Sequence, residues 1–425
     1  MREEKFAIDD RIKDEKLAVD GGRPVRTRPM PPRFALGDAE IAMLEEAIRY
    51  YRSKEVDPGY QGPFEKLYTD EFVAMMGGGY ADSVATGTAA LYVAIAALDL
   101  PKSSEVLVSP ITDPGTISAI IMNGLRPRLA DARANDYNMG SEQVIARLGP
   151  GVSAVLVVHA SGRATDVDRI VEAVRPQGIR VIEDCSQSHG AQIFGRPIGT
   201  FGDVAAFSTM YRKPHMTGGS GGLVYSRDLT VFRNALAHAD RGKPRWQPDF
   251  DDRNPETFLF PALNWNNDEL SCAVGLASLR RLSDTIVRRI AFVAELASQL
   301  AEINTMFSLM PWRPTDSPFI LPLFVDLARA KRDKTAIAEA VLAEGIGLNP
   351  HYRYVVSEWP WVVPHLADGF KPVQALSARD RSFCLYLNEN YTAEEAADIA
   401  AALLKVDRVL GTQPKQKKKI QIRAK

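Results

Sequence analysis

Short apolar runs alternate with helical patterns between about residues 60 and 230. Most of these runs are apolar at both odd and even positions, which is typical of parallel strands with helices on both faces of the sheet. In chain order they read EVLVSP, LRPRLADA, SAVLVVHA, IRVIEDC, DVAAFST and GGLVYS. The pattern predicts an α/β fold whose mostly parallel central sheet is covered by helices.

The rest of the chain also shows helical periodicity. DAEIAMLEEAIRYY predicts a helix with Asp38 as its N-cap, and residues 231–262 are polar and irregular, which predicts an excursion loop. NDELSCAVGLASLRRLSDTIVRRIAFVAELASQLAEI predicts one long helix, or a broken pair, that leads out of the large domain. A strand (FILPLFVDL) and two helices (KTAIAEAVLAEG, TAEEAADIAAALLKV) then predict a smaller C-terminal α/β domain.

These elements divide the chain into four parts. We expect an N-terminal arm over residues 1–35, a large domain over 36–290, a small domain over 291–412 and a basic tail over 413–425. A length of 425 residues is enough for two domains.

Composition narrows the classes of function. The chain has 52 basic and 53 acidic side chains, so net charge favours neither a nucleic acid nor a membrane as partner. Cys185, Cys272 and Cys384 lie far apart and form no CxxC pair, which argues against a disulfide framework or a structural metal site. Without a membrane-spanning apolar stretch or a secretory signal, we expect a cytoplasmic protein.

Polar side chains gather where the predicted strands end, the edge at which parallel sheets bind ligands. Asp184 ends one strand, and Lys213 lies between a later strand and a glycine-rich turn; the full set of such residues is Asp113, Asp131, His159, Asp184 and Ser208. A lysine and a carboxylate so placed can serve pyridoxal phosphate. The lysine forms a Schiff base with its aldehyde, and the carboxylate keeps the pyridine nitrogen protonated.

A phosphate site is predicted where the helix of VATGTAALYVAIAALDL begins. Thr86, Gly87 and Thr88 offer free amides, the helix dipole and two hydroxyls, and Ser208 could add a third. Taken singly, each feature has a simpler reading. Thr-Gly-Thr is also a good helix cap, Asp184 could cap the next helix, and Lys213 could be a solvated surface lysine. GGSGG matches GxSxG, but a strand follows it, so Ser220 is not expected to be a nucleophile.

Together, these segments resemble the pyridoxal-phosphate sugar aminotransferases of the DegT family, which have the fold-type I scaffold. The resemblance runs from about GGRPVRTRP to the C-terminal helix, and EDCSQSHGA and FGDVAAFSTMYRK carry its most specific motifs. It implies that Asp184 lies at the pyridine nitrogen, Gln187 near the ring hydroxyl, and Gly87, Thr88 and Ser208 at the phosphate. Lys213 would be the Schiff-base lysine. LNWNNDELSC resembles a segment whose asparagine reaches the neighbouring subunit's phosphate, which implies an obligate homodimer with Asn264 shared across it.

The chain departs from this family where substrate would be held. The family usually places an aromatic side chain over the ring, but SPITDPGT offers Asp113 and Pro114. Trp265 and Asn266 replace the tyrosine and arginine of the family's Asn-Tyr-Arg segment. What stacks on the ring is therefore unassigned, and the changes leave room for a substrate other than a common nucleotide sugar.

The resemblance implies a transaminase that moves an amino group from glutamate or glutamine to a keto group, with pyridoxamine phosphate as its intermediate. The acceptor would be a nucleotide-linked or phosphorylated sugar, or a cyclitol, in secondary-metabolite or surface-polysaccharide biosynthesis. Residues proposed to contact substrate are Tyr211, His215, His351, Tyr352 and Asn388. Three alternatives stay open: a sugar dehydratase of the same family, in which histidine replaces the lysine; another fold-type I lyase or decarboxylase; and a non-catalytic relative.

Overall fold

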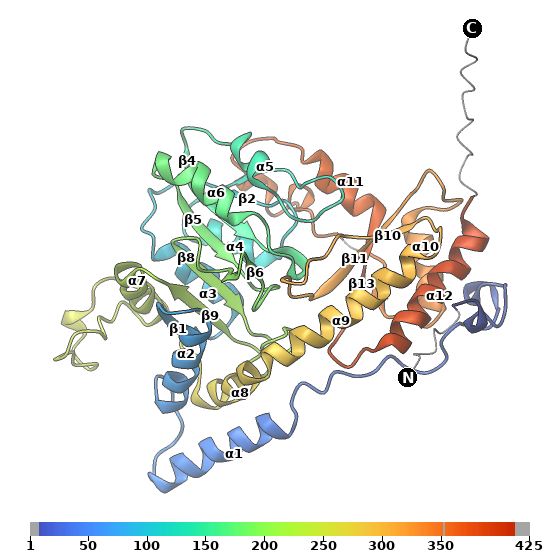
Figure 1. Cartoon of the computed structure of the whole chain (residues 1–425). Coiled ribbons are helices and arrows are strands. Elements are labelled where there is room, and N and C mark those ends of the chain that lie inside the picture. Colours follow the sequence, from blue (N-terminus) through green and yellow to red (C-terminus); the bar gives the residue numbers. More distant parts are fainter. Residues whose placement is uncertain (1–7, 352, 413–425) are drawn as a thin grey trace.

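A seven-stranded sheet lies at the centre of the larger part of the molecule (Figure 1). The computed structural model describes residues 8–351 and 353–412. The strands, in spatial order, are β1 (Tyr80–Val84), β9 (Gly222–Ser226), β8 (Val204–Ser208), β5 (Arg180–Asp184), β4 (Val152–Val158), β2 (Glu105–Val108) and β3 (Arg126–Leu129). The predicted mostly parallel sheet is confirmed.

One strand runs against the others. From β8 to β3 every neighbouring pair is parallel, whereas β9 is antiparallel to both β8 and β1. A parallel return requires a crossover, usually a helix. Residues 209–221 contain no helix, so the chain returns beside β8 in the opposite direction. This connection carries Lys213.

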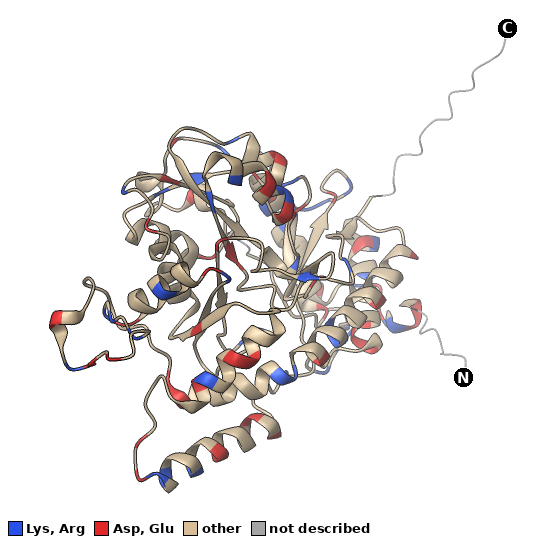
Figure 2. Ribbon diagram, turned by 60° about the vertical axis from the view of Figure 1, so that its left-hand side comes forward, with Lys and Arg blue, Asp and Glu red and all other residues tan. Residues whose placement is uncertain are grey.

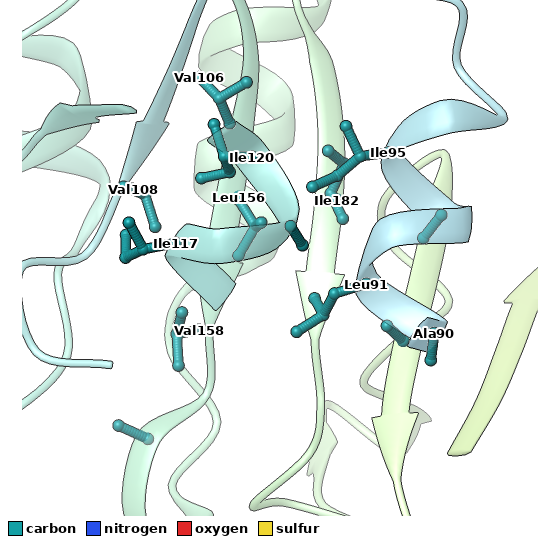
Figure 3. Packing of buried hydrophobic residues seen from close by; sticks show 14 of the residues in the cluster. Ala90, Leu91, Ile95, Val106, Val108, Ile117, Ile120, Leu156, Val158 and Ile182 are labelled. Atoms are coloured by element: carbon teal, nitrogen blue, oxygen red, sulfur yellow. The ribbon is translucent and has the colours of Figure 1, made fainter. Parts of the chain in front are cut away.

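Helices cover both faces of the sheet. Leu156, Val158 and Ile182 pack towards α3 (Gly87–Ala96) and α4 (Pro114–Met122), as Figure 3 shows. Val155, Val157 and Val181 alternate with them and belong to the opposite core, together with residues of α2 (Pro63–Met75), α6 (Val167–Val174) and α8 (Glu269–Arg280). Burial on both faces explains why the strands lack polar alternation.

A second, antiparallel sheet lies in the C-terminal part. Its order is β10 (Phe307–Leu309), β11 (Ile320–Val325), β13 (Ser382–Tyr386) and β12 (Leu348–Asn349). Its core includes residues of α9 (Leu282–Ala301), α10 (Lys334–Ala343) and α12 (Ala393–Leu410). The long helical pattern is the broken pair α8 and α9. Other elements include α5 (Ser141–Ile145), α11 (Val373–Arg381) and the hairpin of β6 (Gln192–Ile193) and β7 (Arg196–Pro197).

Two local predictions were wrong. Residues 229–239 form α7 (Leu229–Ala239) instead of the start of a loop, because Asp228 caps the helix by accepting from the amides of Thr230 and Val231. The N-cap of α1 (Asp38–Ser53) is Gly37, not Asp38, and the Gly37 amide donates to the Glu40 carboxylate at 2.9 Å. The second error is a shift of one residue at a helix end, where boundaries are least well defined by sequence.

The described part of the N-terminal arm runs along the C-terminal part of the molecule before α1 begins (Figure 1). Basic and acidic residues intermingle over the elements (Figure 2). Among the helices described, none has the length and apolar character needed to cross a membrane. The predicted basic tail, 413–425, lies outside the described residues.

Candidate active site

Lys213 lies in the loop that joins β8 to β9, five residues after Ser208. Thr209 and Thr217 close this loop: the Thr217 amide donates to the Thr209 carbonyl at 2.8 Å, and their hydroxyls lie 2.7 Å apart. Gly221 (φ +150°) lets the returning chain pass this pair, since a Cβ there would lie 1.9 Å from Thr217 Oγ1. The glycine-rich turn therefore serves the close approach of the chain to itself.

The Lys213 side chain is buried beside a cavity of about 900 Å³. Its Nζ lies 4.4 Å from the centre of the Phe319 ring. Burial lowers the pKa of Lys213 to about 8, against the opposing influence of Asp184 and Asp113. A lysine with this pKa is partly neutral near physiological pH, as a nucleophile or a base must be.

Asp184 ends β5 and is almost fully buried. Its Oδ2 accepts from Thr116 Oγ1 at 2.9 Å, and its Oδ1 accepts from the Ser186 amide at 3.1 Å. Thr112 Oγ1 in turn donates to Thr116 Oγ1 at 2.8 Å. These contacts hold an acceptor carboxylate in one orientation at the strand end, as a group that must face a ring nitrogen requires.

Gln187 lines the cavity that contains Lys213. Its Oε1 accepts from the Ser161 amide at 2.7 Å. This contact orients the side chain and leaves its amide hydrogens as the groups available to a bound molecule.

The start of α3 forms a cradle suited to an anion. Among the described residues, the amides of Gly87 and Thr88 have no protein acceptor. A Cβ on Gly87 would lie 2.4 Å from the Cβ of Ser208, so only glycine lets the helix start and the end of β8 come this close. Two free amides, the helix dipole and the hydroxyls of Thr88 and Ser208 together fit a phosphate.

Thr86 caps the helix, which is the simpler of the two roles that the Thr-Gly-Thr motif predicts. It is the N-cap of α3, and its Oγ1 accepts from the Ala89 amide at 2.8 Å. Asp113 is likewise the N-cap of α4, accepting from the Gly115 amide at 2.8 Å, but it is exposed and lines the cavity. Asp113 therefore combines a capping contact with access to any molecule bound beside Lys213.

The residues proposed for the substrate side lie in different places. Tyr211 and Asn388 line the cavity. The side-chain amide of Asn388 already binds the protein through both polar atoms: Nδ2 donates to the Pro31 carbonyl, and Oδ1 accepts from the Asn390 amide. His351 lines a separate cavity of about 630 Å³, together with Lys334 and Trp359. Tyr352 lies outside the described residues.

His215 corrects a prediction. It is fully buried, and its Nε2 lies 3.0 Å from the Tyr68 hydroxyl. Its ring packs against Phe72, and burial lowers its pKa to about 3. The side chain belongs to the core behind the Lys213 loop, which does not favour the predicted contact with substrate.

Asp131 and His159, the other polar residues near strand ends, have structural partners. Asp131 accepts from the amides of Gln374 and Ala375 at the start of α11. His159 Nδ1 accepts from the Thr165 amide, and its Nε2 lies 3.2 Å from the Glu183 carboxylate, which also accepts from three backbone amides. These contacts give both residues a structural role.

Asn264 does not line the cavity that contains Lys213. It is exposed on the segment beside residues 239–241, and its Oδ1 accepts from the Asn266 amide nitrogens. Its predicted contact with a neighbouring subunit therefore stays a prediction.

Sequence reasoning missed several cavity residues. Arg33, Arg289 and Phe319 line the cavity, and Glu389 pairs with both arginines. They come from the arm, from α9 and from segments next to the second sheet, and no short motif marks them. Contacts between residues as far apart as Arg33 and Glu389 arise only from the complete fold.

Comparison with known proteins gives one consistent family. The model of the DegT/DnrJ/EryC1/StrS aminotransferase family matches residues 42–404. A Micromonospora echinospora protein named as an L-glutamine:3-amino-2,3-dideoxy-scyllo-inosose aminotransferase is 27% identical, over 92% of this chain and 94% of its own.

Solved structures have the same fold. An aminotransferase from Psychrobacter cryohalolentis superposes with a TM-score of 0.82 at 23% identity, covering 90% of this chain and 100% of that chain. The E. coli GDP-4-keto-6-deoxy-D-mannose-3-dehydratase, solved with bound hydrated pyridoxal phosphate, gives 0.78 at 21% identity, covering 89% and 99%.

Proposed function

The chain belongs to the DegT/DnrJ/EryC1/StrS aminotransferase family, and from this premise we propose that it moves the amino group of L-glutamine or L-glutamate to a keto group on a cyclitol or sugar. The enzyme is a pyridoxal-phosphate-dependent aminotransferase. The observation that carries the proposal is the burial of Lys213 beside a cavity at the strand ends where Asp184 and the α3 cradle also lie. The relative's name favours a keto-cyclitol and L-glutamine over the other substrates.

We assign each role to residues that fit it. The amides of Gly87 and Thr88, with the hydroxyls of Thr88 and Ser208, bind the phosphate. Gln187 donates to the ring hydroxyl. When bound, the cofactor supplies an aldehyde that carries the amino group and a ring that accepts electrons.

Lys213 and Asp184 carry the proton chemistry. Lys213 would hold the cofactor through its aldehyde and, as a free amine, would take the proton from the donor α-carbon. Its lowered pKa, about 8, makes the neutral amine available for this task. Asp184, oriented by Thr116, would hold a proton on the pyridine nitrogen.

The dehydratase alternative is disfavoured by the position of His215. In that branch of the family a histidine stands where the lysine does, but His215 is held in the core by Tyr68. From this loop both Lys213 and Tyr211 line the cavity, and Lys213 is the buried one of the two.

The function is tested by the absorbance of the purified holoenzyme. We expect a visible band from lysine-bound cofactor that bleaches with L-glutamine and returns on addition of 3-amino-2,3-dideoxy-scyllo-inosose. A nucleotide-linked keto sugar added instead is the comparison that separates the two acceptor classes. A band that responds to no amino acid would contradict transamination and favour a dehydratase or lyase.

We further propose a homodimer in which Asn264 of the partner subunit binds the cofactor phosphate. Loss of one hydrogen bond to a charged group costs about 1.5–3 kcal/mol, so Asn264→Ala should weaken cofactor binding about 10- to 100-fold.

We also propose that the chain divides into the predicted arm, large domain and small domain, with the active site between the two domains.

Mixing variants tests the shared site. At limiting cofactor, we expect Asn264→Ala and Lys213→Ala subunits each to have little activity. An equal mixture that exchanges subunits should recover about one quarter of wild-type activity, because half the dimers are hybrids with one intact site of two. If the mixture is no more active than its components, Asn264 acts within its own subunit or not at all.

A further inference from the structure

The N-terminal arm contacts the loop that carries Lys213. Arg33 Nη1 donates to the Tyr211 carbonyl at 2.9 Å, and Nη2 donates to the Pro214 carbonyl at 3.1 Å. These two carbonyls lie on either side of Lys213 along the backbone. One planar guanidinium therefore bridges the loop around the lysine, a geometry for which its fixed fork of donors is suited.

Glu389 fixes this guanidinium from the opposite side. Its Oε1 accepts from Arg33 Nε at 3.0 Å, and its Oε2 accepts from Arg289 Nη2 at 2.8 Å. Burial opposes the charge on Glu389, but Arg289 and Arg33 outweigh it and lower its pKa to about 2. The carboxylate is therefore ionised throughout the physiological range and holds both arginines.

The same carboxylate supports the side chain of Lys213. Arg289, which is fully buried, donates through Nη1 to the Pro318 carbonyl at 3.2 Å. The next residue is Phe319, whose ring lies 4.4 Å from Lys213 Nζ. Glu389 thus links the contact that holds the lysine backbone to the contact that buries its amine.

Separate contacts dock the arm itself. Asn388 Nδ2 donates to the Pro31 carbonyl at 2.9 Å, and Asn390 Nδ2 donates to the Pro32 carbonyl at 2.8 Å. Further back, buried Arg26 pairs with Asp398 at 2.6 Å. Because these contacts hold the arm without touching the Lys213 loop, docking of the arm can be separated by mutation from the bridge made by Arg33.

We propose that Arg33 is a positioning residue: its bridge across the Lys213 loop, held by Glu389, keeps the lysine amine buried against Phe319. The inference rests on the proposed function, in which Lys213 must present a neutral amine. If the bridge is lost, the loop relaxes and water reaches the amine. The pKa of Lys213 then rises from about 8 towards the ordinary 10.5, and the neutral fraction falls at every pH below that range.

The test measures Lys213 in the apoenzyme, so it does not depend on cofactor chemistry. Acetic anhydride labelling of Lys213, followed by mass spectrometry across pH, reports the neutral fraction of the amine. We expect half-maximal labelling near pH 8 in the wild type and about one unit higher in Arg33→Ala, a tenfold smaller neutral fraction at pH 7. Hydrogen exchange of residues 209–217 should be about tenfold faster in the variant.

Three further variants decide between the bridge and general docking. Asp398→Asn, which weakens the docking of the arm through Arg26, and Arg28→Ala, which removes an exposed ion pair with Glu394, should keep the wild-type labelling profile. In Arg33→Gln the pH of half-maximal labelling should rise, as in Arg33→Ala. This variant replaces Arg33→Ala in the test if the alanine variant does not fold. A wild-type labelling profile in both Arg33 variants, or an equal shift of the profile in Asp398→Asn, would overturn the proposal.

Kinetics of the holoenzyme give a second readout. Loss of positioning should lower kcat about tenfold while KM for L-glutamine stays within about twofold, because the three hydrogen bonds that fix the Arg33 guanidinium all go to protein acceptors. An unchanged kcat would count against the bridge. If the wild type shows no lysine-bound cofactor band, the proposed function fails, whereas the apoenzyme labelling still decides whether Arg33 positions the lysine.

Discussion

Lys213→Ala is expected to lower kcat by about 10⁴-fold or more and to remove the absorbance band of lysine-bound cofactor. The variant loses the covalent tether and also the base that moves the proton, and general acid–base catalysis alone contributes about 10²- to 10⁴-fold. The phosphate cradle is untouched, so cofactor should still bind non-covalently. Equilibrium dialysis measures that binding, and single-turnover kinetics with L-glutamine measures the rate.

Lys334→Ala is the matched control for this prediction. Burial lowers the pKa of Lys334, as it does that of Lys213. Lys334 is only partly buried, however, and it lines the separate cavity that contains His351. We expect the cofactor absorbance band and the kcat of Lys334→Ala to match those of the wild type within about twofold. A surviving band in Lys213→Ala, or an equal loss in Lys334→Ala, would contradict the assignment of the tether.

The same residue shows what the sequence could predict. The sequence predicts the apolar strands and their order along the chain. Three residues at or after the ends of these strands, Asp184, Ser208 and Lys213, lie at one edge of the sheet in the structure. The two-sided burial of these strands, a local property of composition, predicts the parallel sheet. The antiparallel direction of β9 follows from a connection that lacks a helix, which the strand pattern alone does not reveal.

Long-range contacts mark the limit of this reasoning. His215 follows Lys213 by two positions in the sequence, but Tyr68, 147 positions earlier, holds it in the core. Arg33 and Glu389 meet across 356 positions, and nothing in RPMPPR or LNEN signals their pairing. Such residues become visible only when the second sheet, α9 and the arm are packed together.

Asp184→Asn is expected to lower kcat by about 10²- to 10³-fold while leaving the fold and the cofactor band in place. The substitution keeps the size of the side chain and can retain the hydrogen bond from Thr116, but it removes the negative charge that holds a proton on the ring nitrogen. Stopped-flow measurement of the half-reaction with L-glutamine gives the rate, and thermal unfolding checks the fold.

A cofactor analogue separates the charge of Asp184 from its packing. N-methylated pyridoxal phosphate keeps a positive ring nitrogen without a proton. With this analogue, kcat of Asp184→Asn should be at least about tenfold higher than with pyridoxal phosphate. Asp131→Asn is the matched control, since Asp131 is also a carboxylate near a strand end. Its oxygens accept from the amides of Ala132, Gln374 and Ala375, and Asp184, not Asp131, acts electrostatically on Lys213. Asp131→Asn should retain wild-type kcat with either cofactor. If the analogue rescues nothing while the variant remains folded, the role of Asp184 is to orient Thr116 and its neighbours, and the ring nitrogen is protonated by another group.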